Sequence, residues 1–165
     1  MDQVAIVLSL ISLIIAAFSL GWNIYRDIIL KPRAKVSVSK ATLVSEVITP
    51  QDKLMISAVN FGPGKIRLGI IRFMHRTILA RLRRNWTHGV IIHDYKNPLS
   101  GQLPVTLDVG ESVDLVFPWD KENLCSRAPT HIGIRDSFGR THWAPISYVQ
   151  KVNKQWVKEF GETQA

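Results

Sequence analysis

The longest hydrophobic stretch of the chain lies at its amino terminus. From Gln3 to Tyr25 the sequence has no acidic or basic side chain apart from the tyrosine. At a rise of about 1.5 Å per residue, about 20 such residues in a helix cross the ~30 Å hydrocarbon core of a bilayer. A cleaved secretory signal would need a basic region before a shorter apolar core, and Asp2 stands where that region would be. We expect an uncleaved transmembrane helix over residues 3–25, with a buried core helix as the alternative.

Apolar and polar residues then alternate with a period of two in several short segments. This alternation predicts half-buried strands, because successive side chains of a strand point to opposite faces. Turn signals rich in Gly and Pro separate the segments. Seven or eight short strands of this kind predict a mainly β protein with an antiparallel β-sandwich over residues 35–145. Inward positions are expected at Val36 and Val38, at Leu54, Ile56 and Ala58, and at Ile66, Leu68 and Ile70, and further strands at Val90–His93, Val105–Val109, Val113–Phe117, His131–Arg135 and Thr141–Trp143.

A basic segment interrupts the strand pattern. Residues 66–74 fit a core strand, whereas residues 75–86 are expected to leave the sandwich as a basic excursion. On a helical projection its apolar side chains share one arc and its arginines the other, a pattern typical of segments that lie on a membrane surface. Contact with lipid headgroups, packing on a sheet edge, and binding of a protein or nucleic acid are the alternatives. The candidate lipid- or anion-contacting residues are Arg72, Arg76, Arg81, Arg83, Arg84 and Trp86.

The carboxyl-terminal segment has the period of an amphipathic helix. Pro145 is a suitable first helical residue, and Gly161 provides a stop, so we expect a helix over residues 146–160 and a short tail over residues 161–165. Its apolar arc can dock on the sandwich, fill the groove of a partner or lie on the bilayer. The residues that we expect to carry this docking or partner binding are Tyr148, Val152, Trp156 and Phe160.

The distribution of charge bears on topology. The 165-residue chain has a formal net charge of +8. Residues 26–96 carry 14 Lys or Arg against 4 Asp or Glu, whereas residues 97–165 carry 7 against 8. Basic residues are retained on the cytoplasmic side of a short-looped anchor, and anionic lipid attracts them near its surface. The linker at residues 26–34 and Lys35 therefore predict an N-out/C-in orientation, with the domain in the cytoplasm close to anionic lipids.

The sequence offers little catalytic chemistry. Cys125 is the single cysteine, which excludes an intramolecular disulfide and a CxxC centre. Gly62-Pro63-Gly64-Lys65 lacks the spacing and the Ser or Thr of a phosphate-binding loop. His131, Asp136 and His142 are the one group that paired strands could bring together as a metal or acid/base cluster. We expect no cofactor and no enzymatic activity, with a histidine-based metal hydrolase as the residual alternative.

Three motif-bearing segments, Ala58–Phe73, Leu103–Phe117 and Ile132–Ile146, give the chain a resemblance to known proteins. Their Asn60-Phe61-Gly62 turn, Leu103-Pro104 step and Asp136–Trp143 hairpin resemble those of small bacterial and prophage-encoded proteins with one amino-terminal anchor and an immunoglobulin-like sandwich. The resemblance implies that fold in a bacterial inner membrane. It implies no activity and no site residues, and its context is superinfection exclusion or phage defence.

Two functional hypotheses follow from these features. The first is a non-enzymatic, single-pass interaction module at the cytoplasmic face of the membrane, with a protein partner that the sequence does not identify. The second is a membrane-tethered nucleic-acid-binding protein that uses the Arg72–Arg84 segment, with Trp86 as a stacking group.

Overall fold

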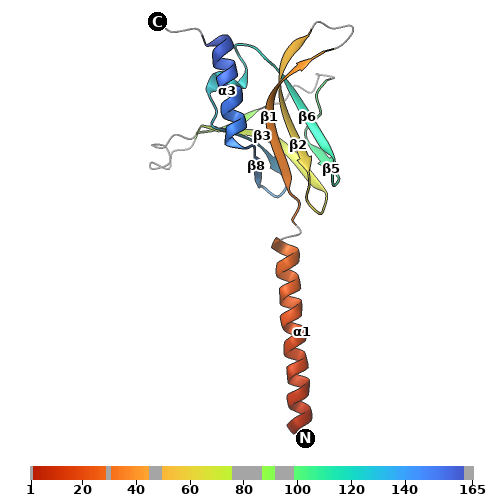
Figure 1. Ribbon diagram of the computed structural model, residues 1–165. Helices are drawn as coiled ribbons and strands as arrows, with labels where there is room; N and C mark the ends of the chain where they lie inside the picture. Colours follow the sequence, from red (N-terminus) through yellow and green to blue (C-terminus); the bar gives the residue numbers. More distant parts are fainter. Residues whose placement is uncertain (1, 29–30, 45–49, 76–86, 92–98, 162–165) are drawn as a thin grey trace.

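The computed structural model describes residues 2–28, 31–44, 50–75, 87–91 and 99–161. They form an apolar amino-terminal helix, two antiparallel β-sheets and a carboxyl-terminal helix (Figure 1). The prediction of a mainly β protein flanked by these two helices is confirmed.

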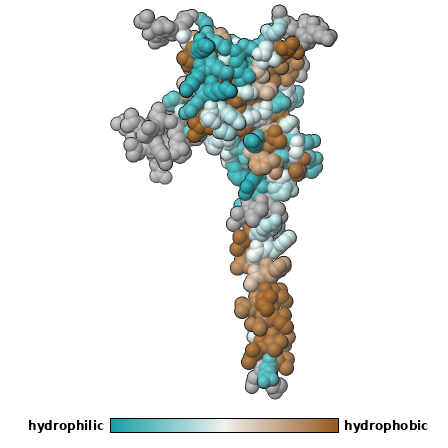
Figure 2. Space-filling view, in the orientation of Figure 1, coloured by the Kyte–Doolittle hydropathy of each residue, from teal (hydrophilic) through white to brown (hydrophobic). Residues whose placement is uncertain are grey.

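The helix α1 spans Asp2–Ile28 and is long and apolar enough over Gln3–Tyr25 to cross a membrane. None of this span is buried in the protein, so the alternative of a buried core helix is wrong. Figure 2 shows a hydrophobic surface along most of α1. Near its end Trp22 and Tyr25 stack with ring centroids 5.9 Å apart, at a position typical of the aromatic belt at a membrane interface.

The first sheet has the order β1-β2-β6 and is antiparallel throughout. Its strands are β1 (Ala34–Leu43), β2 (Gln51–Asn60) and β6 (Ser112–Pro118). The pairing of β1 with β2 runs without a slip from Ala34 opposite Asn60 to Leu43 opposite Gln51. We call the end of the domain at Ala34, where the chain arrives from α1, the proximal end, and the end at Leu43 the distal end.

The second sheet has the order β4-β3-β7-β8, and β5 pairs with the first residues of β3. Its strands are β3 (Ile66–His75), β4 (Thr87–Ile91), β5 (Val105–Leu107), β7 (His131–Asp136) and β8 (Thr141–Trp143). The predicted hairpin around Asp136 joins β7 to β8, as the sequence indicates.

One predicted inward position of β3 is wrong. The register between β3 and β7 shifts between Leu68 and Ile70. An extra residue of this kind reverses the faces of the residues that follow. Ile70 is therefore exposed, and Ile71 takes its place in the core.

The two sheets enclose one hydrophobic core. Val36, Ile56 and Leu115 of the first sheet belong to the same buried cluster as Ile66 and Ile134 of the second. The contacting faces are those that the period-two pattern predicts, apart from the shift in β3.

The carboxyl-terminal helix α3 spans Ile146–Phe160, the range expected from the sequence. Pro145 precedes it as the N-cap instead of being its first residue, and its carbonyl accepts hydrogen bonds from the amides of Tyr148 and Val149. The helix lies beside β1 (Figure 1). Val149 and Val152 are buried in the common core.

Candidate functional site

A groove of about 530 Å³ lies on the side of the domain between β4 and β6. Its apolar floor comes from both sheets, with Phe73 on β3 and Phe117 on β6 both packed against the core. Asp120, Glu122 and Arg127 give it a charged rim. The other lining residues are Val90, Ile91, Pro118, Asn123 and Leu124.

The Phe73 ring occupies the space where a side chain at the paired position of β4 would lie, so that position has to be a glycine. Gly89 is paired with Phe73, and a Cβ at Gly89 would overlap the phenyl ring. The guanidinium of Arg127 lies 6.0 Å from the centroid of the same ring. At this distance a cation is attracted to the aromatic face. Phe73 is thus held between a glycine on one strand and a cation on the opposite wall.

The wall that carries Arg127 is the 3₁₀ helix η1 (Leu124–Arg127). Asn123 precedes η1, and its side chain accepts a hydrogen bond from the amide of Cys125 at 3.1 Å and donates one to the carbonyl of Pro118. These bonds tie η1 to the end of β6. Burial raises the pKa of the Cys125 thiol to about 12, so this cysteine packs as a small apolar residue.

The predicted basic surface lies mostly outside the described residues. Arg72 is on β3, half-buried and paired with Val90 and Gly133. Since side chains alternate along a strand, Arg72 faces away from Ile71 and from the groove residue Phe73. The other residues of the set are outside the described part of the chain: Arg76, Arg81, Arg83, Arg84 and Trp86.

The predicted docking residues of α3 lie in different surroundings. Val152 is in the core, and Trp156 packs against the core and donates its indole N–H to the carbonyl of Asp120 at 2.8 Å. Phe160 is half-buried, with its ring 5.9 Å from that of Trp156 and 6.2 Å from that of Trp119. Tyr148 is exposed and lines a smaller cleft of about 230 Å³ between α3 and β1.

A charged cluster fastens α3 to the first sheet at the distal end. The ammonium of Lys40 lies 2.6 Å from carboxylate oxygens of both Asp52 and Glu159. Hydrogen bonds from Lys40 and from the Trp119 indole hold the pKa of Glu159 below its usual value. The bond from Lys40 likewise lowers the pKa of Asp52, and bonds to both acids raise the pKa of Lys40. The arrangement is a structural clamp.

Only one histidine of the candidate cluster, His142, lies next to Asp136. His142 Nε2 lies 3.0 Å from Asp136 Oδ2. His131 is an odd number of residues from Asp136 on the same strand and so points to the other face, where its ring lies 5.9 Å from that of Trp143. Among residues 2–28, 31–44, 50–75, 87–91 and 99–161 there is no group of three or more His, Cys, Asp or Glu side chains placed to hold a metal ion.

The carboxylate of Asp136 stabilises the turn between β7 and β8 by accepting hydrogen bonds. Its side chain has no solvent exposure. Oδ1 accepts the amides of Phe138 and Arg140 at 2.9 Å, and Oδ2 accepts Arg140 Nε and His142 Nε2 at 3.0 Å. Burial opposes ionisation, but the hydrogen bonds from His142 and Arg140 outweigh it and lower the pKa of Asp136.

Sequence reasoning missed the groove. Phe73 and Phe117 lie on strands of different sheets, so their proximity depends on how the sheets pack. Asn123 provides a local signal, since asparagine before a short apolar turn is a frequent helix N-cap. No family model matches this chain, and no curated protein or solved structure matches it. Its function has to follow from its own geometry.

Proposed function

We propose that this protein is a non-enzymatic, single-pass membrane-anchored interaction module that binds a protein partner at the cytoplasmic face of a bacterial inner membrane. The observation that carries the proposal is the independence of the two parts. The β domain has a closed core to which α1 contributes no residue among those described, while the span of α1 is wholly unburied. An exposed apolar helix of this length is stable in a bilayer and insoluble outside it.

The linker supports the proposed orientation. Lys31, Arg33 and Lys35 are exposed. In the sequence Arg26 follows the span directly, and these three residues come soon after it. The excess of basic residues next to a first span favours the cytoplasmic side for the segment that carries them. The proposal therefore places the domain in the cytoplasm and the amino terminus outside.

The strand order supports an immunoglobulin-like domain as part of this proposal. The orders β1-β2-β6 and β4-β3-β7-β8 correspond to A-B-E and C′-C-F-G of an immunoglobulin domain, in which C′ adds to the sheet of C, F and G. The groove beside β4 is the contact surface that we assign to the partner. Its apolar floor and charged rim suit a short apolar segment flanked by polar residues. The proposal extends to a partner that acts in superinfection exclusion or phage defence, the context that the sequence resemblance implies.

Site-specific photo-cross-linking in intact membranes tests the partner surface. A photoreactive residue at Val90, which is exposed and lines the groove, is expected to form an adduct with one protein. The same residue at Ile146, which is similarly exposed but lies outside the groove, is the matched control and should form none. Equal yields at both positions, or adducts at Ile146 alone, would exclude the groove as the contact surface.

Thiol accessibility tests the orientation. A Lys158→Cys variant places an exposed thiol on α3, whereas the native Cys125 is buried. An impermeant maleimide should label the variant only after the cells are lysed. Labelling in intact cells would place the domain outside and contradict the cytoplasmic assignment.

A further inference from the structure

Three turns at the proximal end each present an exposed apolar side chain. Phe61 lies in the turn between β2 and β3, Val109 in the turn between β5 and β6, and Phe138 in the turn between β7 and β8. Their exposed fractions are 59%, 59% and 68%. In each case a glycine follows directly in the sequence. We call these three residues the apolar tips.

The first two turns are joined by a buried asparagine. Asn60 has no solvent exposure. Its side-chain amide donates to the carbonyl of Gly64 in its own turn and to that of Leu107 at the start of the other turn, at 2.8 and 3.1 Å. Its backbone N–H donates to the carbonyl of Glu111, and its carbonyl accepts from Gly110. Phe61 and Val109 are thereby held on neighbouring turns of fixed shape.

The third turn is fixed by Asp136 and joined to the linker. Asp136 accepts the amide of Phe138 itself, and the amide of Ser137 donates to the carbonyl of Arg67. Arg140 reaches the carbonyl of Pro32 at 3.5 Å and lies 5.1 Å from the centroid of the Phe138 ring. These hydrogen bonds hold the turn in one shape, so the exposed Phe138 ring has a fixed position at the proximal end.

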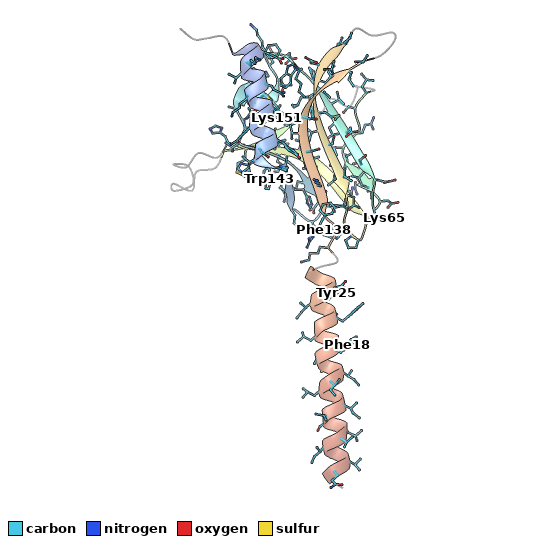
Figure 3. All side chains as sticks on the ribbon, in the orientation of Figure 1. Phe18, Tyr25, Lys65, Phe138, Trp143 and Lys151 are labelled. Carbon is cyan, nitrogen blue, oxygen red and sulfur yellow. The ribbon has the colours of Figure 1, made fainter. Side chains whose placement is uncertain are left out.

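The chain from α1 arrives among these same turns. The amide of Phe61 donates to the carbonyl of Arg33 at 3.1 Å, and Gly62 leaves no room for a Cβ against the backbone of Pro32 and Arg33. From Tyr25 at the end of the span to Pro32, one helical turn and four extended residues reach at most roughly 20 Å. Figure 3 shows Phe138 and Lys65 at the end of the domain that faces Tyr25 and α1.

We propose that the proximal end rests on the membrane, and that the apolar tips enter the interfacial layer of the bilayer on the side where α1 emerges. Apolar and aromatic side chains are favoured at this depth, next to headgroups that attract cations. Lys31, Arg33 and Lys35 are exposed at the same end. The contact rests on α1 as a retained span, and it holds for either orientation of the chain. It fixes the tilt of the domain, and the groove residues Phe117 and Pro118, at the end of β6 opposite Leu54 and Lys53, lie away from the membrane.

The test uses the full chain in vesicles of phosphatidylethanolamine and phosphatidylglycerol. Phe138→Cys and Phe61→Cys carry an environment-sensitive fluorophore, and the buried Cys125 stays unlabelled. The matched control is Val44→Cys, an exposed apolar position beyond the distal end of β1. We expect blue-shifted emission at both phenylalanine positions. We also expect quenching by nitroxide-headgroup lipids there and several-fold less quenching by aqueous iodide than at Val44.

A second variant tests the three tips as one surface. With the fluorophore at Val109→Cys, the additional changes Phe61→Ser and Phe138→Ser are expected to abolish quenching by the nitroxide lipids. Iodide access at Phe138 and Phe61 equal to that at Val44 would overturn the membrane contact. Carbonate extraction separates this result from failure of the anchor, because a chain that stays in the membrane with its tips in water contradicts the contact alone. A chain released by carbonate contradicts the span on which both proposals rest.

Discussion

Lys40 on the first strand and Glu159 on the last helix form an ion pair of 2.6 Å across 119 residues of sequence. Together with the hydrogen bond from the Trp119 indole to the same carboxylate, this ion pair holds the carboxyl-terminal end of α3 in place on the first sheet. Its partners come from β1, from the segment that follows β6 and from α3. An intact cluster therefore shows that β1, the segment after β6 and α3 are packed together.

Glu159→Gln is expected to lower the free energy of unfolding by about 0.2–1 kcal/mol, since the carboxylate is more than one-third exposed and solvent screens the pair. The pKa of Glu159 is lowered in the folded chain, so its contribution is present above the ordinary value of 4.5 and is lost as the pH falls through the folded pKa. Denaturant titration at neutral pH measures the loss, which should shrink in 1 M salt. A loss that salt leaves unchanged would rule out the ionic origin.

Asp136→Asn is expected to cost about 1–3 kcal/mol, because the carboxylate is buried and accepts several hydrogen bonds, whereas its partner Arg140 is more than one-third exposed. The amide would place a donor against Arg140 and His142. Because the folded pKa of Asp136 is lowered, its contribution should persist above about 3.8 and disappear as the pH falls below that value. Thermal unfolding between pH 2 and pH 7 measures both effects. The exposed Asp114 provides the control, and Asp114→Asn should change stability by less than about 0.5 kcal/mol.

Trp156→Ala is expected to destabilise the domain by about 2–3 kcal/mol, below the 3–5 kcal/mol of a fully buried tryptophan, because Trp156 is half-buried. Trp156→Phe keeps most of the packing and loses the hydrogen bond to Asp120, at about 1 kcal/mol. Val157→Ala on the exposed neighbour is the control, with a change within about 0.5 kcal/mol. Equal melting temperatures for Trp156→Ala and Val157→Ala would show that the indole does not hold α3 in place.

Gly62→Ala is expected to loosen the junction between the linker and the domain. The new Cβ would collide with the backbone of Arg33 and Pro32, and overpacking of this kind costs about 1–3 kcal/mol. At Gly64 a Cβ would lie 3.6 Å from Pro32 Cγ, an ordinary contact, so Gly64→Ala is the matched control. Hydrogen exchange of the Phe61 amide, which bonds to Arg33, should accelerate only in the first variant. Unchanged exchange in Gly62→Ala would contradict the close approach.

The native Cys125 is expected to resist maleimide as long as the domain is folded. Burial raises the pKa of its thiol to about 12, so the reactive thiolate is scarce at neutral pH. Mass spectrometry should show one adduct in urea and none in buffer within the time that labels an exposed cysteine such as that of Lys158→Cys. Rapid labelling in buffer would mean that η1 opens without unfolding of the domain.

The strands could be predicted from sequence because their signal is local. From Ala34 to Val38 and from Leu54 to Asn60 every second residue is buried, and the pairing has no slip. The inward position predicted for Ile70 is wrong because the shift in β3 arises from pairing with β7, which is far away in the sequence. In α3, Val152 of the apolar arc lies in the core and Trp156 packs against it. Tyr148 and Val157 lie on the same arc and are exposed, since only the middle of that arc faces the domain.

The surfaces that we assign to function are harder to predict from sequence than the strands, because they depend on how the strands are arranged in space. The apolar tips carry a local signal, an apolar residue directly before a glycine, but three turns in different parts of the chain could not be placed together without the strand order. Asn60 and Asp136 are likewise ordinary turn residues in sequence. Their burial follows from the way β2, β5 and β7 end at the same place.

Because α3 covers the edge of β1, this edge is shielded only late in the synthesis of the chain. The consecutive residues Ser37–Lys40 line the cleft against α3, so the helix lies along the outer edge of β1, whose partner among the described strands is β2. At roughly 5–20 residues per second, the ribosome needs on the order of ten seconds to add the 119 residues from Lys40 to Glu159. During that time the edge of β1 stays open, and an open edge pairs readily with other chains. The helix that shields the first strand is thus translated after all the described strands, and a chain cut short before Ile146 would have an unprotected edge at β1.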